Sequence, residues 1–226
     1  IRDRSLILLI DISINEPGPT FSSFLKDLIS DIMLIMFSTC WVLESLVIDT
    51  DNDPNSADTG RRLAKMYVNE LMSGRYDTRP KATAFPNDSQ EAYKGMLVVR
   101  SELKSMCSHH HQPVAGVAYI GIIAHKKLIG LSKYTRIAQW CARRGTLQEE
   151  LANDIAREIQ KATGTKDLGV YIQATHGCVE NRGVKAHSSL TQTTVLKGAF
   201  KNEGKVQKEF MDNIKLQQSF AGSKGQ

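Results

Sequence analysis

The stretch MLVVRSELKSMCSHHHQPVAGVAYIGII, residues 96–123, contains two apolar segments on either side of a cysteine and histidine cluster. The segments MLVVRSEL, residues 96–103, and VAGVAYIGII, residues 114–123, are rich in β-branched residues and predict two strands. Between them, one thiol and three imidazoles fall within five residues. Such a run is compatible with a metal site, a catalytic site or chance, and the histidines alone decide little.

The segments that follow predict two helices and then two more strands. SKYTRIAQWCARR and QEELANDIAREIQKATG carry apolar residues at helical spacing, and the second ends at a glycine. The predicted elements are helices over 132–144 and 148–164, strands over 168–179 and 191–200, and a polar helix over 206–217. This order predicts an α+β fold, with an antiparallel sheet backed by helices.

The N-terminal part differs in character from the rest. TDNDPNSAD, residues 50–58, is a polar loop in which Asp58 can cap a helix that Gly74 would end. The apolar run from Asp31 to Leu43 predicts a buried or interface helix. We therefore divide the chain into an atypical extension or helical arm (1–49), an N-terminal helix with a connecting loop (50–95), a catalytic domain (96–217) and a polar tail (218–226).

Composition narrows the class of protein. The 226 residues are 41% hydrophobic and 23% charged, as expected of a soluble globular protein with one good core. The net charge of +5 favours an anionic partner, but the basic residues are spread out and aromatics make up only 7%. We therefore expect neither nucleic acid nor a membrane as a partner.

The four cysteines are too few for a disulfide scaffold in a chain of this size. We expect a reducing compartment and place the protein in the cytoplasm. The apolar run near Asp31 is shorter than the roughly twenty residues that a spanning helix needs, and it lacks the features of a secretory signal.

Two Cys-His clusters suggest a metal site. Cys107 and His110 have C-x-x-H spacing, and Cys178 lies in a second cluster, THGCVENRG. Three protein ligands leave tetrahedral zinc one open position, as in catalytic sites, and thiolates favour zinc (Zn2+) over magnesium or calcium. The alternative is that the cysteines are small buried hydrophobes and the histidines face solvent. His125 and His187 are interpreted as surface histidines.

Several motifs together resemble type I GTP cyclohydrolase, a family of zinc enzymes that open pterin biosynthesis. They run in the family's order from about Asp58 to Phe200: DTGRRLAKMYVNEL, CSHHHQPVAG, IGLSKYTRIAQWCARR, LQEELANDIA, ATHGCVENRGV and SLTQTTVLKGAF. The resemblance implies the tunnelling fold, assembled into a multimeric ring that is typically a homodecamer with active sites between subunits. It also implies conversion of GTP and water to 7,8-dihydroneopterin triphosphate and formate.

The resemblance also implies roles for individual residues. The zinc ligands fall on Cys107, His110 and Cys178, and the acid-base histidines on His109 and His176. Zinc would activate water for attack at carbon 8 of the purine, and the histidines would transfer protons as the imidazole ring of the base opens.

Substrate recognition follows from the same motifs. Glu149, with Gln148 beside it, would accept hydrogen bonds from guanine, although an acidic first helical turn explains the same residues without a ligand. Ser132 matches a serine near the ribose and phosphates. The cations expected to bind the triphosphate are Lys133, Arg136 and Arg182, with Arg62 and Lys65 reaching in from a neighbouring subunit; a solvated helix face is the alternative for the last two.

The sequence departs from the family pattern at four points. Ser108 replaces a glutamate, Gly60 replaces a proline at the start of a helix, RRGTLQEE replaces RRLQVQER, and His111 replaces an apolar residue. Ser108 keeps two alternatives open: a relative on the same fold that acts on another purine or pterin, and a non-catalytic nucleotide-binding oligomer. Retention of His109 and His176 argues against a pure binder. The sequence identifies no regulatory partner.

Overall fold

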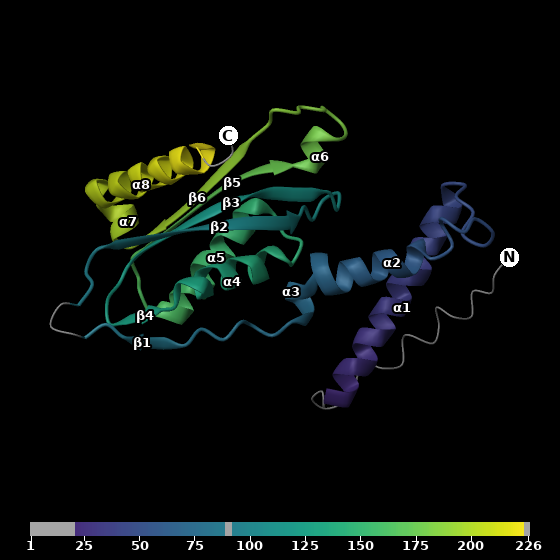
Figure 1. Cartoon of the computed structure of the whole chain (residues 1–226), viewed down its shortest axis with the longest axis horizontal. Helices are drawn as coiled ribbons and strands as arrows, with labels where there is room; N and C mark the ends of the chain where they lie inside the picture. The colour runs from purple at the N-terminus through teal and green to yellow at the C-terminus, as the bar shows by residue number, and fades with distance from the viewer. Residues whose placement is uncertain (1–20, 89–91, 224–226) are drawn as a thin grey trace. The chain divides into compact units, whose positions relative to one another are not determined.

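The computed structural model describes residues 21–88 and 92–223, and the chain divides between Met66 and Tyr67 into two compact units (Figure 1). The part of the predicted N-terminal extension before residue 21 lies outside the described residues.

The first unit contains helices α1 (Phe21–Ser45) and α2 (Thr59–Met66), which pack against each other. A Cβ on Gly60 would lie 2.5 Å from Sγ of Cys40, so the small residue lets α2 approach α1 closely. The predicted helix near Asp31 is confirmed, but its apolar side chains are not buried within this chain: Phe37 is 48% and Trp41 is 52% exposed.

The second unit is an α+β assembly, as predicted. Its strands are β1 (Ala84–Pro86), β2 (Met96–Met106), β3 (Pro113–Ile123), β4 (Lys127–Ile129), β5 (Leu168–His176) and β6 (Thr191–Lys197). Its helices are η2 (a π-helix, Tyr67–Leu71), α3 (Ser73–Tyr76), α4 (Leu131–Ala142), α5 (Gln148–Thr163), α6 (Gly177–Glu180), α7 (Ala199–Asn202) and α8 (Gly204–Ser223).

Four of the strands form an antiparallel sheet in the order β2-β3-β5-β6. β1 and β4 form a separate antiparallel pair. In the larger sheet β3 and β5 are the inner strands, with Ser105 of β2 paired to Val114 and Val114 paired to His176 of β5. This register brings the end of β2, the start of β3 and the end of β5 to the same edge of the sheet.

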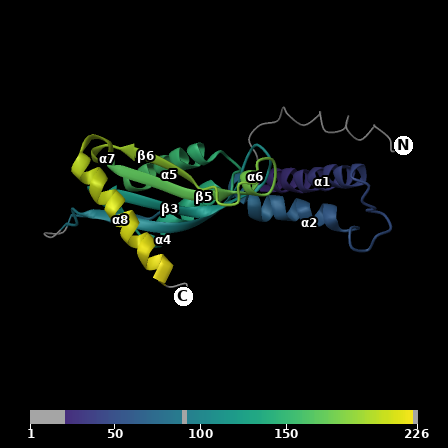
Figure 2. The same ribbon diagram turned by 90° about the horizontal axis from the view of Figure 1, so that it is seen from above.

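The two faces of this sheet pack against different helices. α4 and α5 cover one face, and α8 crosses the other (Figures 1 and 2). Successive residues of β3 alternate between the faces because side chains on a strand have a period of two: Ile120 packs into the α4 and α5 core, whereas Tyr119 packs with Phe200 and Phe210 under α8. The sheet therefore lies between two hydrophobic cores.

The predicted helix over residues 58–74 differs from the structure. It divides into α2, η2 and α3, and Gly74 lies inside α3. A Cβ on Gly74 would lie 2.2 Å from the backbone oxygen of Trp140, and the N–H of Gly74 donates to the carbonyl of Arg143 at 2.9 Å. The prediction that Gly74 ends the helix was wrong, because the close approach of α4 requires glycine there.

The carboxylate of Asp58, predicted to cap the same helix, accepts a hydrogen bond from Nε of Arg61 at 2.6 Å. Two predicted strands were too long: β5 ends at His176, just before α6, and β6 ends at Lys197.

None of the helices described within 21–88 and 92–223 has the length and apolar character needed to cross a lipid bilayer.

Candidate metal centre

Three elements meet at one edge of the sheet and place the two Cys-His clusters together. Cys107 follows directly after β2, His176 is the last residue of β5, and Cys178 lies in the short helix α6. The pairing of β2 with β3 and of β3 with β5 fixes these positions. Segments about seventy residues apart in sequence thus come into contact through the register of the sheet.

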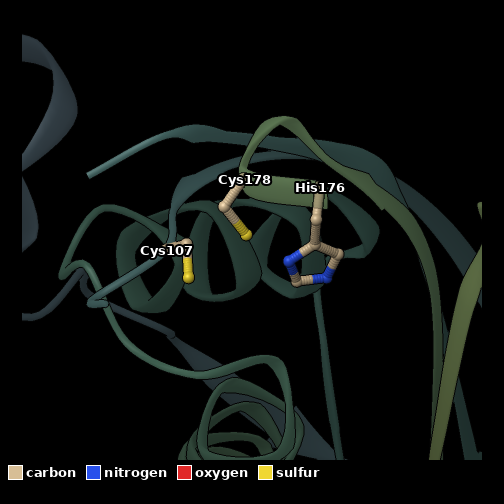
Figure 3. Close-up of side chains that lie close together, drawn as sticks. All are labelled: Cys107, His176 and Cys178. Atoms are coloured by element: carbon tan, nitrogen blue, oxygen red, sulfur yellow. The ribbon is translucent and has the colours of Figure 1, made fainter. Parts of the chain in front are cut away.

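The ligand atoms of Cys107, His176 and Cys178 all lie within 4.8 Å of one another. We call these three residues the thiol cluster. Cys107 is 5% exposed, and the other two are partly buried. Figure 3 shows the imidazole of His176 turning Nδ1, the nitrogen bonded to Cγ, toward the two sulfurs and turning Nε2 away from them. Among the described residues, this is the group of histidine, cysteine and carboxylate side chains whose geometry suits a metal ion.

Burial shifts the pKa values of two members of the thiol cluster, Cys178 and His176, toward their uncharged forms. Burial raises the pKa of the Cys178 thiol, and so do its hydrogen bond with Cys107 and the charge of that neighbour, whereas Arg182 opposes the effect. Burial lowers the pKa of His176, against the influence of Glu149 and Glu180. A metal ion bound here would displace thiol protons, as metal binding to cysteine requires.

The donor set fits zinc. Two sulfurs and an imidazole nitrogen are typical zinc ligands, and neighbouring ligand atoms on tetrahedral zinc lie roughly 3.3–3.8 Å apart, given bond lengths of about 2.0–2.3 Å. The ligand atoms of the thiol cluster, all within 4.8 Å of one another, lie near this spacing. Cys107 and Cys178 therefore lie where the sequence analysis expects two of the ligands.

The histidine in the thiol cluster is His176, which the resemblance assigned to acid-base catalysis. His109 and His110 lie in a turn after Cys107, are exposed, and have ring centroids 6.3 Å apart. His111 has a positive φ of 49°, and its N–H donates to the carbonyl of Cys107 at 2.9 Å. His110 as a third ligand stays a prediction.

Gln148 connects α5 to the thiol cluster, a link that sequence reasoning missed. Its side chain is buried, and Oε1 lies 2.7 Å from Nε2 of His176. Its Nε2 donates to the carbonyls of Ile172 and Thr191 and to Oγ1 of Thr193. No sequence motif signals these contacts, because they depend on how α5 lies over β5 and β6.

The other predicted site residues are spread over both units, and the structure does not bring all of them to this edge. The first turn of α4 lies at the opposite end of that helix from Ala142, whose carbonyl accepts a hydrogen bond from Ser105 near the thiol cluster. Glu149 is exposed in the first turn of α5, and Ser132 is exposed in the first turn of α4. Lys133 is partly buried, Arg182 is exposed after α6, and Arg136 lines a cavity of about 390 Å³ that is also lined by Ser73 of α3.

Arg62 and Lys65 are exposed on α2 of the first unit. His125 and His187 are exposed, as predicted, and Nε2 of His125 lies 2.5 Å from Oδ2 of Asp167.

Comparison with known proteins gives a consistent result. The family described as GTP cyclohydrolase I matches residues 41–215. GTP cyclohydrolase 1 from Aeromonas salmonicida (strain A449) is 42% identical over 176 residues, covering 77% of this chain and 79% of the relative. GTP cyclohydrolase 1 from Flavobacterium johnsoniae is 39% identical over 181 residues, covering 79% of each chain.

A solved structure described as the archaeosine synthase QueF-Like in the apo form matches with a TM-score of 0.36 and 11% identity. It covers 46% of this chain and 93% of that one, and a likeness at this level adds nothing to the assignment. The family match and the sequence identities are sufficient without it: this chain belongs to the GTP cyclohydrolase I family.

Proposed function

We propose that this chain is a zinc-dependent enzyme that converts GTP and water to 7,8-dihydroneopterin triphosphate and formate. The observation that carries the proposal is the thiol cluster: two cysteines and a histidine within 4.8 Å of one another, in a chain whose family match spans residues 41–215. The names of the relatives indicate the reaction, and the donor set of two cysteines and a histidine suits the zinc ion proposed to activate water.

Zinc would be held by Cys107, His110 and Cys178, with His176 beside them. The C-x-x-H spacing of Cys107 and His110 and the position of Cys178 in the thiol cluster support this set. When bound, zinc supplies a polarised water of lowered pKa.

Protons would be moved by His109 and His176. Burial favours the neutral form of the His176 imidazole, which is the form able to accept a proton. His109 lies in the turn after Cys107, at the same edge of the sheet. The two histidines would serve the opening of the imidazole ring and the later rearrangement of the ribose.

The nucleotide would be bound by an acidic residue at its base and by cations at its phosphates. Glu149, exposed in the first turn of α5, would accept paired hydrogen bonds from guanine, with Gln148 next to it in sequence. Ser132 would lie near the ribose and phosphates. The cations proposed to bind the triphosphate are Lys133, Arg136, Arg182, Arg62 and Lys65.

The active form would be a homo-oligomer, a decamer whose active sites lie between subunits, in the cytoplasm. Arg62 and Lys65 would then reach the site of a neighbouring subunit. Sedimentation analysis tests the assembly, since a monomer with full activity would contradict a shared site.

The test of the function is incubation of zinc-loaded protein with GTP, followed by detection of formate and of oxidised neopterin fluorescence. We expect both products in equal amounts. Ser108, in place of the family glutamate, makes a nucleotide panel necessary. Faster turnover of another purine nucleotide would favour a relative with a different substrate, and tight GTP binding with no product would show a non-catalytic binder.

A further inference from the structure

The buried amide of Gln148 has its donors occupied by the protein. The residue is 4% exposed and begins α5. Its Nε2 lies 3.4 Å from the carbonyl of Ile172 and 3.2 Å from the carbonyl of Thr191. It also lies 3.2 Å from the hydroxyl of Thr193. Three acceptors surround a group with two N–H donors, so none is left for a nucleotide base.

These partners fix which way the amide points. Carbonyl oxygens only accept hydrogen bonds, so the NH₂ group of Gln148 must face Ile172 and Thr191. A flipped amide would put Oε1 against two carbonyl oxygens and leave its NH₂ group facing the imidazole. Oε1 therefore faces His176, and the contact of 2.7 Å is one in which the amide oxygen accepts.

The state of the His176 ring follows from this contact. Because Oε1 can only accept, Nε2 of His176 carries the hydrogen. In the neutral ring the other nitrogen, Nδ1, then holds a lone pair, and Nδ1 is the atom turned toward the sulfurs of Cys107 and Cys178 (Figure 3). The hydrogen-bond network that runs from the backbone of β5 and β6 through Gln148 thus ends at a lone pair directed into the thiol cluster.

We propose that Gln148 is a positioning residue, which fixes the Nε2–H tautomer and the orientation of His176 so that the Nδ1 lone pair faces Cys107 and Cys178. A hydrogen bond at one ring nitrogen sets which nitrogen of a histidine carries the hydrogen and how the ring is oriented. The inference deepens the proposed function, on which it rests for the role of the thiol pair. It also gives Gln148 a role different from contact with guanine, since its N–H donors are taken.

The test is the tautomer of His176 in metal-free protein, measured by ¹⁵N NMR of protein with labelled histidine. Spectra of a His176→Asn variant identify the resonances by subtraction from the six histidines. In the native chain we expect a protonated Nε2 whose hydrogen exchanges slowly and an unprotonated Nδ1. A protonated Nδ1 with an unprotonated Nε2 would overturn the proposal.

The variant that removes the acceptor is Gln148→Met, an unbranched residue of similar size. We expect the His176 Nε2 hydrogen to exchange rapidly and the shifts of the two nitrogens to move toward each other. Gln160→Met is the matched control, because Gln160 lies on the same helix and accepts instead from Lys197, at 3.4 Å. Unchanged His176 resonances in folded Gln148→Met would overturn the proposal.

Kinetics of the zinc-loaded enzyme separate positioning from substrate binding. We expect Gln148→Met to lower kcat for GTP by about 10–100-fold with little change in KM. A raised KM with unchanged kcat would instead place Gln148 on the base and overturn its positioning role. If GTP is not turned over at all, the tautomer still tests Gln148, and the proposed function fails separately.

Discussion

Two buried polar side chains on α5 make a useful comparison, because each is only 4% exposed and each contacts residues far away in sequence. Glu158, toward the end of the helix, accepts hydrogen bonds of 2.7 Å from Nε of Arg79 and from Nζ of Lys161. Gln148, at the start, is anchored by backbone carbonyls and ends at the imidazole of His176.

The difference lies in the last partner of each network. The cations that meet Glu158 extend to the surface, where the side chain of Arg79 is 37% and that of Lys161 is 58% exposed. The negative charge of Glu158 is thus balanced by two cations, and its contact with Arg79 holds the segment that contains Arg79 against α5. Gln148 instead orients the imidazole of His176, which faces the thiols of Cys107 and Cys178. Burial of a polar side chain therefore does not by itself indicate a functional site. The partner at the end of its hydrogen-bond network does.

The largest effect on activity should come from Cys178, one of the two thiols at the end of the Gln148 hydrogen-bond network. We expect Cys178→Ala to lose bound zinc and to reduce formate production from GTP by more than the roughly 10–100-fold that loss of an outer-shell partner costs. Zinc per chain and formate are the measurements. Cys141→Ala is the matched control, because Cys141 is fully buried among apolar residues of the core and burial raises the pKa of its thiol to about 12. Unchanged zinc in Cys178→Ala would remove Cys178 from the site.

The Glu158 network should respond in stability and not in zinc. Glu158→Gln keeps the shape but removes the charge that Arg79 and Lys161 meet, so the free energy of unfolding should fall by about 1–3 kcal/mol. Denaturant titration measures it, and zinc per chain should stay constant. Glu209→Gln, at an exposed position of α8, should change stability by less than about 0.5 kcal/mol. Loss of zinc in Glu158→Gln would end the distinction between the two networks.

The free energy of unfolding should depend on pH through the same carboxylate. Burial alone would raise the pKa of Glu158, but its hydrogen bonds with Lys161 and Arg79, together with their charges, hold that pKa below its ordinary value of 4.5. Its contribution to stability is thus fully present above that value and is lost as pH falls through the lowered pKa. The difference in unfolding free energy between the native chain and Glu158→Gln should shrink as pH falls below 4.5. A difference that grows would contradict the sign of this linkage.

The smallest effect should come from one anchor of the Gln148 network. Thr193→Val removes one of three acceptors around the amide of Gln148 and leaves the two carbonyls. We expect a loss of about 0.5–1.5 kcal/mol in unfolding free energy, with unchanged zinc content. Thermal unfolding and metal analysis measure the two quantities. If zinc were lost here as in Cys178→Ala, the carbonyls would not be sufficient to hold Gln148.

Much of the fold was predictable from local patterns. The β-branched segment over residues 114–123 lies in β3, and the helical spacing over 148–164 corresponds to α5, which Gly164 caps with a φ of 73°. The short strands β1 and β4 were missed, because three residues carry no periodicity. Gly74 was misinterpreted because a close contact with α4 and a helix stop both favour glycine.

The site was predictable only in part. The thiols of Cys107 and Cys178 lie together as the two Cys-His motifs suggest. The link from Gln148 to His176 could not be predicted, since it depends on how α5 packs over the sheet and on the backbone of β5 and β6. The family assignment is confirmed by the match over residues 41–215, whereas the complete ligand set stays a prediction.

The most direct test of the central claim is a zinc titration of metal-free protein in which bound zinc and formate released from GTP are measured in the same samples. We expect activity to rise in proportion to bound zinc and to reach its limit near one zinc per chain, with neither signal in Cys178→Ala. Formate production by the metal-free chain, or by Cys178→Ala, would contradict the claim that the thiol cluster is a catalytic metal centre.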